Sequence, residues 1–220
     1  MKEFGEQGKE KLVQERLTPD SNRISSVALL YANVFAGWPW FEVSKGPVCQ
    51  KFYGPDFKPG ATCPCGCGTL KEAYPKEATI TYINQELSKP LAYGETILFE
   101  DKPVGFGWGY ELSGQEFAET KYRLPESRNM IQELIGKDNI YFYISEVGII
   151  PDMQENGLGT RITTSLVDTG SSRGLPLLMR TNASSPMVKI AQKSGMLAII
   201  GPKLEFVDQE NPERIVFRKT

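Results

Sequence analysis

The residues whose types and spacing best suggest chemistry lie in the stretch 144–160. Residues 141–150 are rich in aromatic and β-branched side chains, which predicts a buried strand. From Gly157 onward apolar residues recur every four positions, which predicts a helix. Gly157 and Gly159 let a ligand approach the backbone closely, and the first helical turn presents unpaired N–H groups with a partial positive charge. This strand-to-helix turn therefore predicts a pyrophosphate site.

Two other phosphate-binding loops do not fit this turn. A P-loop ends in Gly-Lys-Ser/Thr, whereas Thr160 and Arg161 follow Gly159 here. A dinucleotide-binding fingerprint needs three glycines near the first strand of a chain, which this turn does not provide. The remaining alternative is an ordinary loop and helix start without a ligand.

The pattern Gln154-x-x-Gly157-x-Gly159 resembles the acyl-CoA signature of the GNAT superfamily of N-acyltransferases, usually written Gln/Arg-x-x-Gly-x-Gly/Ala. The element order expected for residues 21–218, apart from a cysteine-rich insertion, is also similar to that of the GNAT fold. The resemblance implies an α/β (α+β) fold in which helices flank a mixed central sheet. It further implies an N-acetyltransferase that transfers the acetyl group of acetyl-CoA directly to an amine.

By this resemblance, acetyl-CoA lies where the predicted strands 141–150 and 175–181 separate, at their carboxyl ends. Backbone groups of Val147 and Ile149 would then contact the pantetheine, and Gly148 would mark a β-bulge. The full set of implied cofactor residues is Val147, Ile149, Gln154, Glu155, Asn156, Gly157, Leu158, Gly159, Thr160 and Asn182.

The chain has no histidine, so the group that takes a proton from the amine must be a carboxylate, tyrosine, cysteine, amino terminus or bound water. Glu146 is the first candidate, acting directly or through a water relay. Strand alternation predicts that it shares a face with Phe142, Ile144, Gly148 and Ile150, and apolar neighbours would raise its pKa. Glu111 and Tyr110 are the alternative bases, and Glu146 would then simply pair with an Arg or Lys.

Many GNAT proteins have a tyrosine that protonates the leaving thiolate, four residues before the glycine of a Gly-Phe pair. Ala191 occupies that position here, because the corresponding glycine is Gly195. Tyr143 and Ser185 are the candidates to replace this acid, and a thiolate near its own pKa also leaves without one. The departure favours the rival interpretation, a noncatalytic protein that binds acyl-CoA or a partner and whose cysteine-rich module is the working surface.

The acceptor amine is expected beside aromatic residues. The segment 31–40 is similar to the first helix and following loop of many GNAT enzymes, where the loop borders the acceptor site. The candidates are Trp38, Trp40, Trp108 and Tyr110, and for each the alternative is packing in the core. Small amines, peptide N-termini and lysines are all compatible acceptors.

An insertion at residues 44–75 contains all four cysteines of the chain, Cys49, Cys63, Cys65 and Cys67. Two disulfides would require a bond between cysteines two or four apart, and the two-apart case is strained. Four thiolates can instead close a tetrahedral zinc site, with free thiols or an iron–sulfur cluster as alternatives. Because four cysteines leave no open coordination position, we expect a structural module or a recognition lid.

Composition sets the remaining expectations. The 220 residues, 40% hydrophobic and 24% charged, predict an ordinary globular domain at 21–220, interrupted by residues 44–75 and preceded by a flexible lead-in at 1–20. A net charge of -2 without a basic run argues against nucleic acid, and no apolar run reaches the roughly 20 residues that span a bilayer. The polar start lacks a signal peptide, so we expect a cytoplasmic protein.

Overall fold

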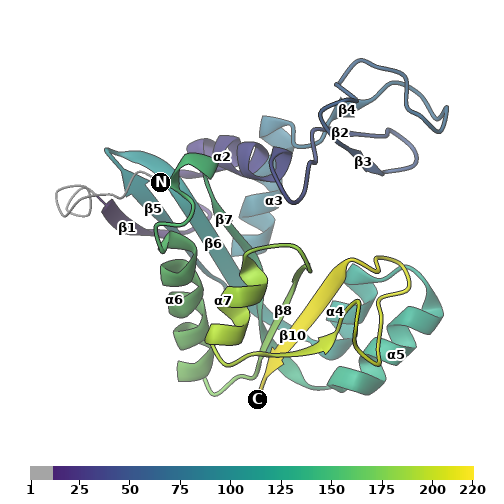
Figure 1. Cartoon of the computed structure of the whole chain (residues 1–220). Helices are drawn as coiled ribbons and strands as arrows, with labels where there is room; N and C mark the ends of the chain where they lie inside the picture. The colour runs from purple at the N-terminus through teal and green to yellow at the C-terminus, as the bar shows by residue number, and fades with distance from the viewer. Residues whose placement is uncertain (1–11) are drawn as a thin grey trace.

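Seven strands form one mixed sheet in the computed structural model, which describes residues 12–220 (Figure 1). Their order is β1-β5-β6-β7-β8-β10-β9, and only β7 and β8 run parallel. The predicted mixed sheet is therefore confirmed. The strands are β1 (Leu12–Leu17), β5 (Tyr93–Phe99), β6 (Lys102–Ser113), β7 (Ile140–Ile149), β8 (Leu177–Asn182), β9 (Leu197–Ile200) and β10 (Arg214–Lys219).

Helices cover both faces of this sheet, as predicted. One face packs against α6 and α7 through a core that includes Ile162 and Ala191. The other face packs against α2 and α3 around Trp108, and against α4 and α5 around Tyr110. None of these helices is long and apolar enough to cross a bilayer within residues 12–220. Their bounds are α2 (Ile24–Ala36), α3 (Lys76–Leu87), α4 (Gly114–Lys121), α5 (Pro125–Ile135), α6 (Leu158–Ser172) and α7 (Met187–Lys193).

A row of glycines on β6 lets α6 lie close to the sheet. A Cβ atom at Gly107 would come within 2.4 Å of Ile162 Cγ2, and one at Gly105 would come within 3.3 Å of Ile162 Cδ1. The side chains at 106, 108 and 110 point to the opposite face, because strand residues alternate. The glycines therefore serve helix packing and not ligand approach.

A β-bulge at Ser145 changes which face Glu146 occupies. Glu146 pairs with Trp108 of β6, whereas Ile144 pairs with the next residue, Gly109, so Ser145 is the extra residue. Ile144 packs against α6, but Glu146 faces α2 and α3. The expectation that Glu146 shares a face with Ile144 was wrong, and so was the expected bulge at Gly148, whose pairing with β6 is regular.

Two elements differ from the sequence-based expectations. Residues 12–17, assigned to a flexible lead-in, form the edge strand β1 and pair with β5 throughout; the lead-in at residues 1–11 lies outside the described part of the chain. Helix α4 was not predicted, although Ser113 and Glu116 form a capping box at its start. Helix α4 ends at Lys121.

The cysteine-bearing insertion forms a separate three-stranded sheet with the order β3-β2-β4, at one edge of the molecule (Figure 1). Its strands are β2 (Ser44–Lys45), β3 (Phe52–Tyr53) and β4 (Lys71–Glu72). The chain enters and leaves this module side by side, because the Ala73 N–H donates to the Val43 carbonyl at 3.3 Å.

Candidate active site and cysteine cluster

The site begins where the two parallel strands separate. β7 and β8 pair only over Phe142–Ile144 and 177–179, although β7 continues to Ile149. The predicted separation is therefore present. The Ile150 N–H donates to β6, and since hydrogen-bonding groups alternate along a strand, those of Val147 and Ile149 point toward the gap. The Ile149 carbonyl accepts from the Gln154 side chain at 3.2 Å.

The turn after β7 leads into an uncapped helix start. Pro151–Met153 form a short 3-10 helix, and Gly157 is the N-cap of α6 with φ +78°, a conformation that favours glycine. Gly157 supplies no side-chain cap, and no side chain within residues 12–220 accepts from the first-turn N–H groups of Leu158, Gly159 and Thr160, so these groups are available to an anion. This donor set fits a pyrophosphate.

The other predicted cofactor residues lie around the same turn. Glu155 and Asn156 are exposed, and the Asn156 side chain donates to the backbone carbonyls of Met153 and Gln154. Asn182 ends β8, where its Oδ1 accepts from the backbone and hydroxyl of Ser184. Asn182 therefore stabilises its own turn in this structure.

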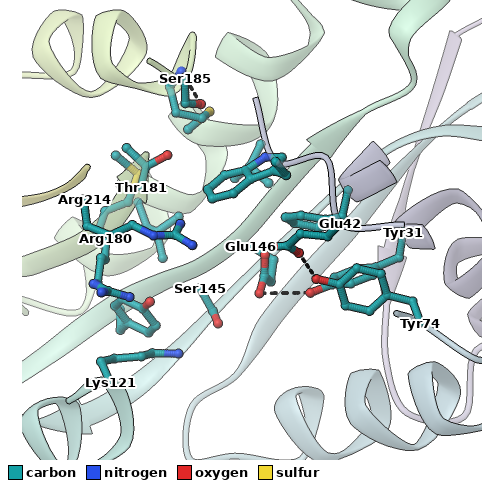
Figure 2. A pocket seen from close by; sticks show the side chains of 17 residues that line it. Tyr31, Glu42, Tyr74, Lys121, Ser145, Glu146, Arg180, Thr181, Ser185 and Arg214 are labelled. Carbon is teal, nitrogen blue, oxygen red and sulfur yellow. Dashed lines mark hydrogen bonds between the residues drawn. The ribbon is translucent and has the colours of Figure 1, made fainter. Parts of the chain in front are cut away.

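A cavity of about 200 Å³ lies beside the gap between the strands (Figure 2). It is lined by residues of α2, both ends of the cysteine module, β7, β8, the end of α4, the start of α7 with the turn before it, and the start of β10. Its lining residues are Tyr31, Phe35, Trp40, Glu42, Tyr74, Lys121, Tyr143, Ile144, Ser145, Glu146, Val147, Met179, Arg180, Thr181, Ser185, Met187 and Arg214.

Glu146 lies in the cavity wall with two tyrosine hydroxyls beside it. Tyr31 and Tyr82 both donate to its Oε1, at 3.3 and 3.0 Å, and Oε2 accepts no hydrogen bond from residues 12–220. Burial raises the pKa of the Glu146 carboxyl to about 7, and Lys121 and the Tyr82 hydroxyl only partly offset this. A carboxyl with this pKa is suited to accept a proton near neutral pH.

A second carboxylate, Glu42, lies on the same side of the cavity. It accepts a hydrogen bond from Tyr74, and burial raises the pKa of Glu42. These two residues flank the cysteine module in the sequence, so the base of the module forms part of the cavity wall. Burial also raises the pKa of Tyr74, which therefore remains a protonated donor.

Three cations, Lys121, Arg180 and Arg214, lie opposite the carboxylates (Figure 2). Sequence reasoning missed all three, because they come from the end of α4, from β8 and from the start of β10. The one sequence feature that could have helped is the capping box at the start of α4, which predicts that helix and therefore the position of Lys121 at its end. The Arg214 guanidinium lies 4.6 Å from the centre of the Trp40 ring, which holds it at the wall.

The aromatic candidates for the acceptor site divide into two groups. Trp40 lines the cavity, whereas Trp38 is 52% exposed and does not. Trp108 is fully buried and stacks on Tyr31 and Phe106, and Tyr110 is 2% exposed. Trp108 and Tyr110 are therefore buried in the core and do not line the cavity.

The acid that the sequence lacks has two possible replacements at the cavity. Ala191 is a residue of α7 and is fully buried on the face of that helix that packs into the core. Ser185 lines the cavity, and its Oγ accepts from the Met187 N–H at 3.2 Å, which leaves the hydroxyl hydrogen free to donate. Tyr143 also lines the cavity, beneath Lys121.

The four cysteines converge in the small module. Their Sγ atoms all lie within 4.8 Å of one another, with 3.8 Å between Cys49 and Cys63 and 3.3 Å between Cys63 and Cys65. No disulfide joins them. Sulfurs at about 2.3 Å from a tetrahedral zinc ion are separated by about 3.8 Å, so this arrangement fits a tetrahedral metal site. The Tyr53 hydroxyl lies 3.3 Å from Cys63 Sγ.

Comparison with known proteins gives a structural match. No protein-family model and no curated protein sequence matches the chain. The acetyltransferase of the GNAT family from Streptococcus pneumoniae is 11% identical, with a TM-score of 0.52 over 95% of this chain and 98% of that one. The PaiA N-acetyltransferase from Thermoplasma acidophilum, solved with coenzyme A, is 7% identical, with a TM-score of 0.53 over 95% and 98%.

A mosquito arylalkylamine N-acetyltransferase-like protein is 13% identical, with a TM-score of 0.52 over 94% of this chain and 99% of that one. At such identities the likeness establishes the fold alone. The chain has the fold of the GNAT acetyltransferases, with a clustered four-cysteine group added.

Proposed function

We propose that the protein is an N-acetyltransferase that moves the acetyl group of acetyl-CoA directly to an amine. The observation that carries this proposal is the position of Glu146, whose pKa is raised to about 7, in a cavity beside the gap between β7 and β8. The uncapped start of α6 and the GNAT fold support acetyl-CoA as the acetyl donor.

Each step of the transfer has a candidate residue. Amides of the α6 first turn bind the pyrophosphate, and the Val147 N–H polarises the thioester carbonyl. Glu146 Oε2 takes a proton from the ammonium, directly or through water, so that the nitrogen forms a C–N bond while the C–S bond breaks. The second amine proton passes to the leaving thiolate, with the Ser185 hydroxyl or Tyr143 as the relay.

The test is acetyl-CoA consumption with a panel of amines, together with calorimetric titration of acetyl-CoA. Binding with turnover supports the proposal. Binding without turnover of any amine supports the noncatalytic interpretation, which the buried Ala191 at the tyrosine position favours. Folded protein that binds no acetyl-CoA contradicts both.

The pH dependence provides a second test. Glu146 accepts protons only when it is ionised, and its pKa is raised to about 7, so kcat/KM is expected to fall as pH decreases through 7. Measuring kcat/KM from pH 5 to 9 checks this. An ordinary exposed glutamate titrates near 4.3, so a profile with no decline between pH 8 and 6 would argue against Glu146 as the base.

We further propose that the four cysteines bind a structural zinc ion. Cys49, Cys63, Cys65 and Cys67 would hold it, which fills all four coordination positions and leaves the metal no part in the chemistry. Purified protein is expected to contain about one zinc per chain by elemental analysis. Replacing Cys63, the buried member of the cluster, with serine should reduce this content. Metal-free protein with four titratable thiols would refute the assignment.

A further inference from the structure

Opposite charges line the cavity without pairing with one another. Within residues 12–220, Arg180 pairs with Asp208 at 2.8 Å and Lys121 has no ion pair. The carboxylates Glu42 and Glu146 are bound by tyrosine hydroxyls instead. Figure 2 shows the carboxylates on one side of the cavity and the three cations on the other. Such a separation leaves room for a ligand that carries both charges.

The cationic side also has hydrogen-bond donors without acceptors. The Nε atoms of Arg180 and Arg214 are buried, and neither has a hydrogen-bond partner in the described chain. Arg214 Nε lies 3.5 Å from the carboxylate of Glu213, an ion pair without hydrogen-bond geometry. These two Nε atoms are closed off from the cavity, so an anionic ligand would be attracted by the positive charge of the three lining side chains, Lys121, Arg180 and Arg214, and not bound at Nε.

The size and charge of the cavity limit which anionic ligands it can hold. A cavity of about 200 Å³ holds a small molecule, and the rings of Tyr31, Phe35 and Trp40 supply apolar wall. Asp208 pairs with Arg180 at 2.8 Å and Glu213 pairs with Arg214 at 3.5 Å, so Lys121 is the lining cation without an ion pair within residues 12–220. Carboxylates on one wall of the cavity and cations on the other suit a zwitterionic ligand.

We propose that the acceptor is a small amino acid, with its amine toward Glu146 and its carboxylate toward Arg214, Arg180 and Lys121. This inference rests on the proposed acetyltransferase function and adds the substrate class. The arginine guanidinium offers donors in a fixed fork that matches a carboxylate, and the Trp40 ring lies 4.6 Å from the Arg214 guanidinium.

The test compares free amino acids with their amides and their decarboxylated amines, in acetyl transfer and in calorimetric binding to the CoA-bound protein. Ethanolamine and phosphoethanolamine form a second pair, which tests whether a phosphate group is preferred to a carboxylate. Free amino acids are expected to have kcat/KM at least about tenfold above the matched amines, the effect of one hydrogen bond to a charged group. Arg214→Gln should bring this ratio close to one, while Lys203→Gln, at an exposed site, should leave it unchanged.

The outcomes separate the two proposals. Binding that requires the carboxylate, without turnover, supports the substrate pocket and contradicts catalysis. Turnover in which amines and amides match the free amino acids supports catalysis and overturns the amino acid assignment. Preference for phosphoethanolamine, or no carboxylate dependence in either measurement, also overturns it.

Discussion

Replacing Glu146 with glutamine is expected to lower kcat by about 10²- to 10⁴-fold, the usual contribution of a general base. The amide oxygen can still accept from Tyr31 and Tyr82, so the cavity wall is preserved, but the side chain can no longer take the proton. Steady-state kinetics at saturating acetyl-CoA measures the loss, and calorimetry should show acetyl-CoA affinity unchanged.

Glu42→Gln is the matched control for this variant. Glu42 lies in the same cavity, also accepts from a tyrosine and also has a raised pKa, but it belongs to the loop after α2 and not to β7. If Glu146→Gln keeps its kcat, or if only Glu42→Gln loses it, Glu42 and not Glu146 is the base.

Gly159→Glu is expected to weaken acetyl-CoA binding by at least about 100-fold, because it places a carboxylate at the helix start that would bind the pyrophosphate. The fold should survive, since a Cβ at Gly159 would meet only the ends of Ile190 and Ile149, at 3.4 and 3.7 Å. Calorimetric titration measures the affinity, and circular dichroism confirms the folded state.

Gly159→Ala provides the comparison. Its methyl group fits the same space, its N–H remains, and alanine is a better helix former than glycine. Affinity close to that of the unchanged protein is therefore expected. If the alanine and glutamate variants bind acetyl-CoA with equal affinity, acetyl-CoA does not bind at this turn.

Sequence reasoning succeeded where local patterns determine the structure. The apolar strand before Pro151, the helix after Gly157 and the hairpin of β5 and β6 all follow from residue periodicity and turn residues. The clustering of the cysteines also followed from their number and spacing, because a compact loop brings close neighbours together.

It failed where distant segments meet. A bulge at Ser145 reverses the alternation of β7, and no local pattern shows a single unpaired residue. Strand β1 is stabilised by pairing with β5, some 80 positions away, whereas its own mixed sequence of apolar and charged residues gives no clear strand pattern. The cations of the cavity come together only when α4, β8 and β10 are assembled.

The way in which the cysteine module joins the domain has a consequence for how such a protein diversifies. Val43 and Ala73 are hydrogen-bonded neighbours, so the module is a cassette whose two ends meet at one point of the scaffold. Changes in its length or sequence have little effect on the seven-stranded sheet, since surface insertions with adjacent ends are well tolerated. Glu42 and Tyr74, however, lie where the cassette joins the domain, and they are hydrogen-bonded to each other. Exchanging the cassette is therefore expected to change the cavity wall at Glu42 and Tyr74 while the turn before α6 stays the same. Under the proposed function, the acceptor site would then vary independently of the acetyl-CoA site.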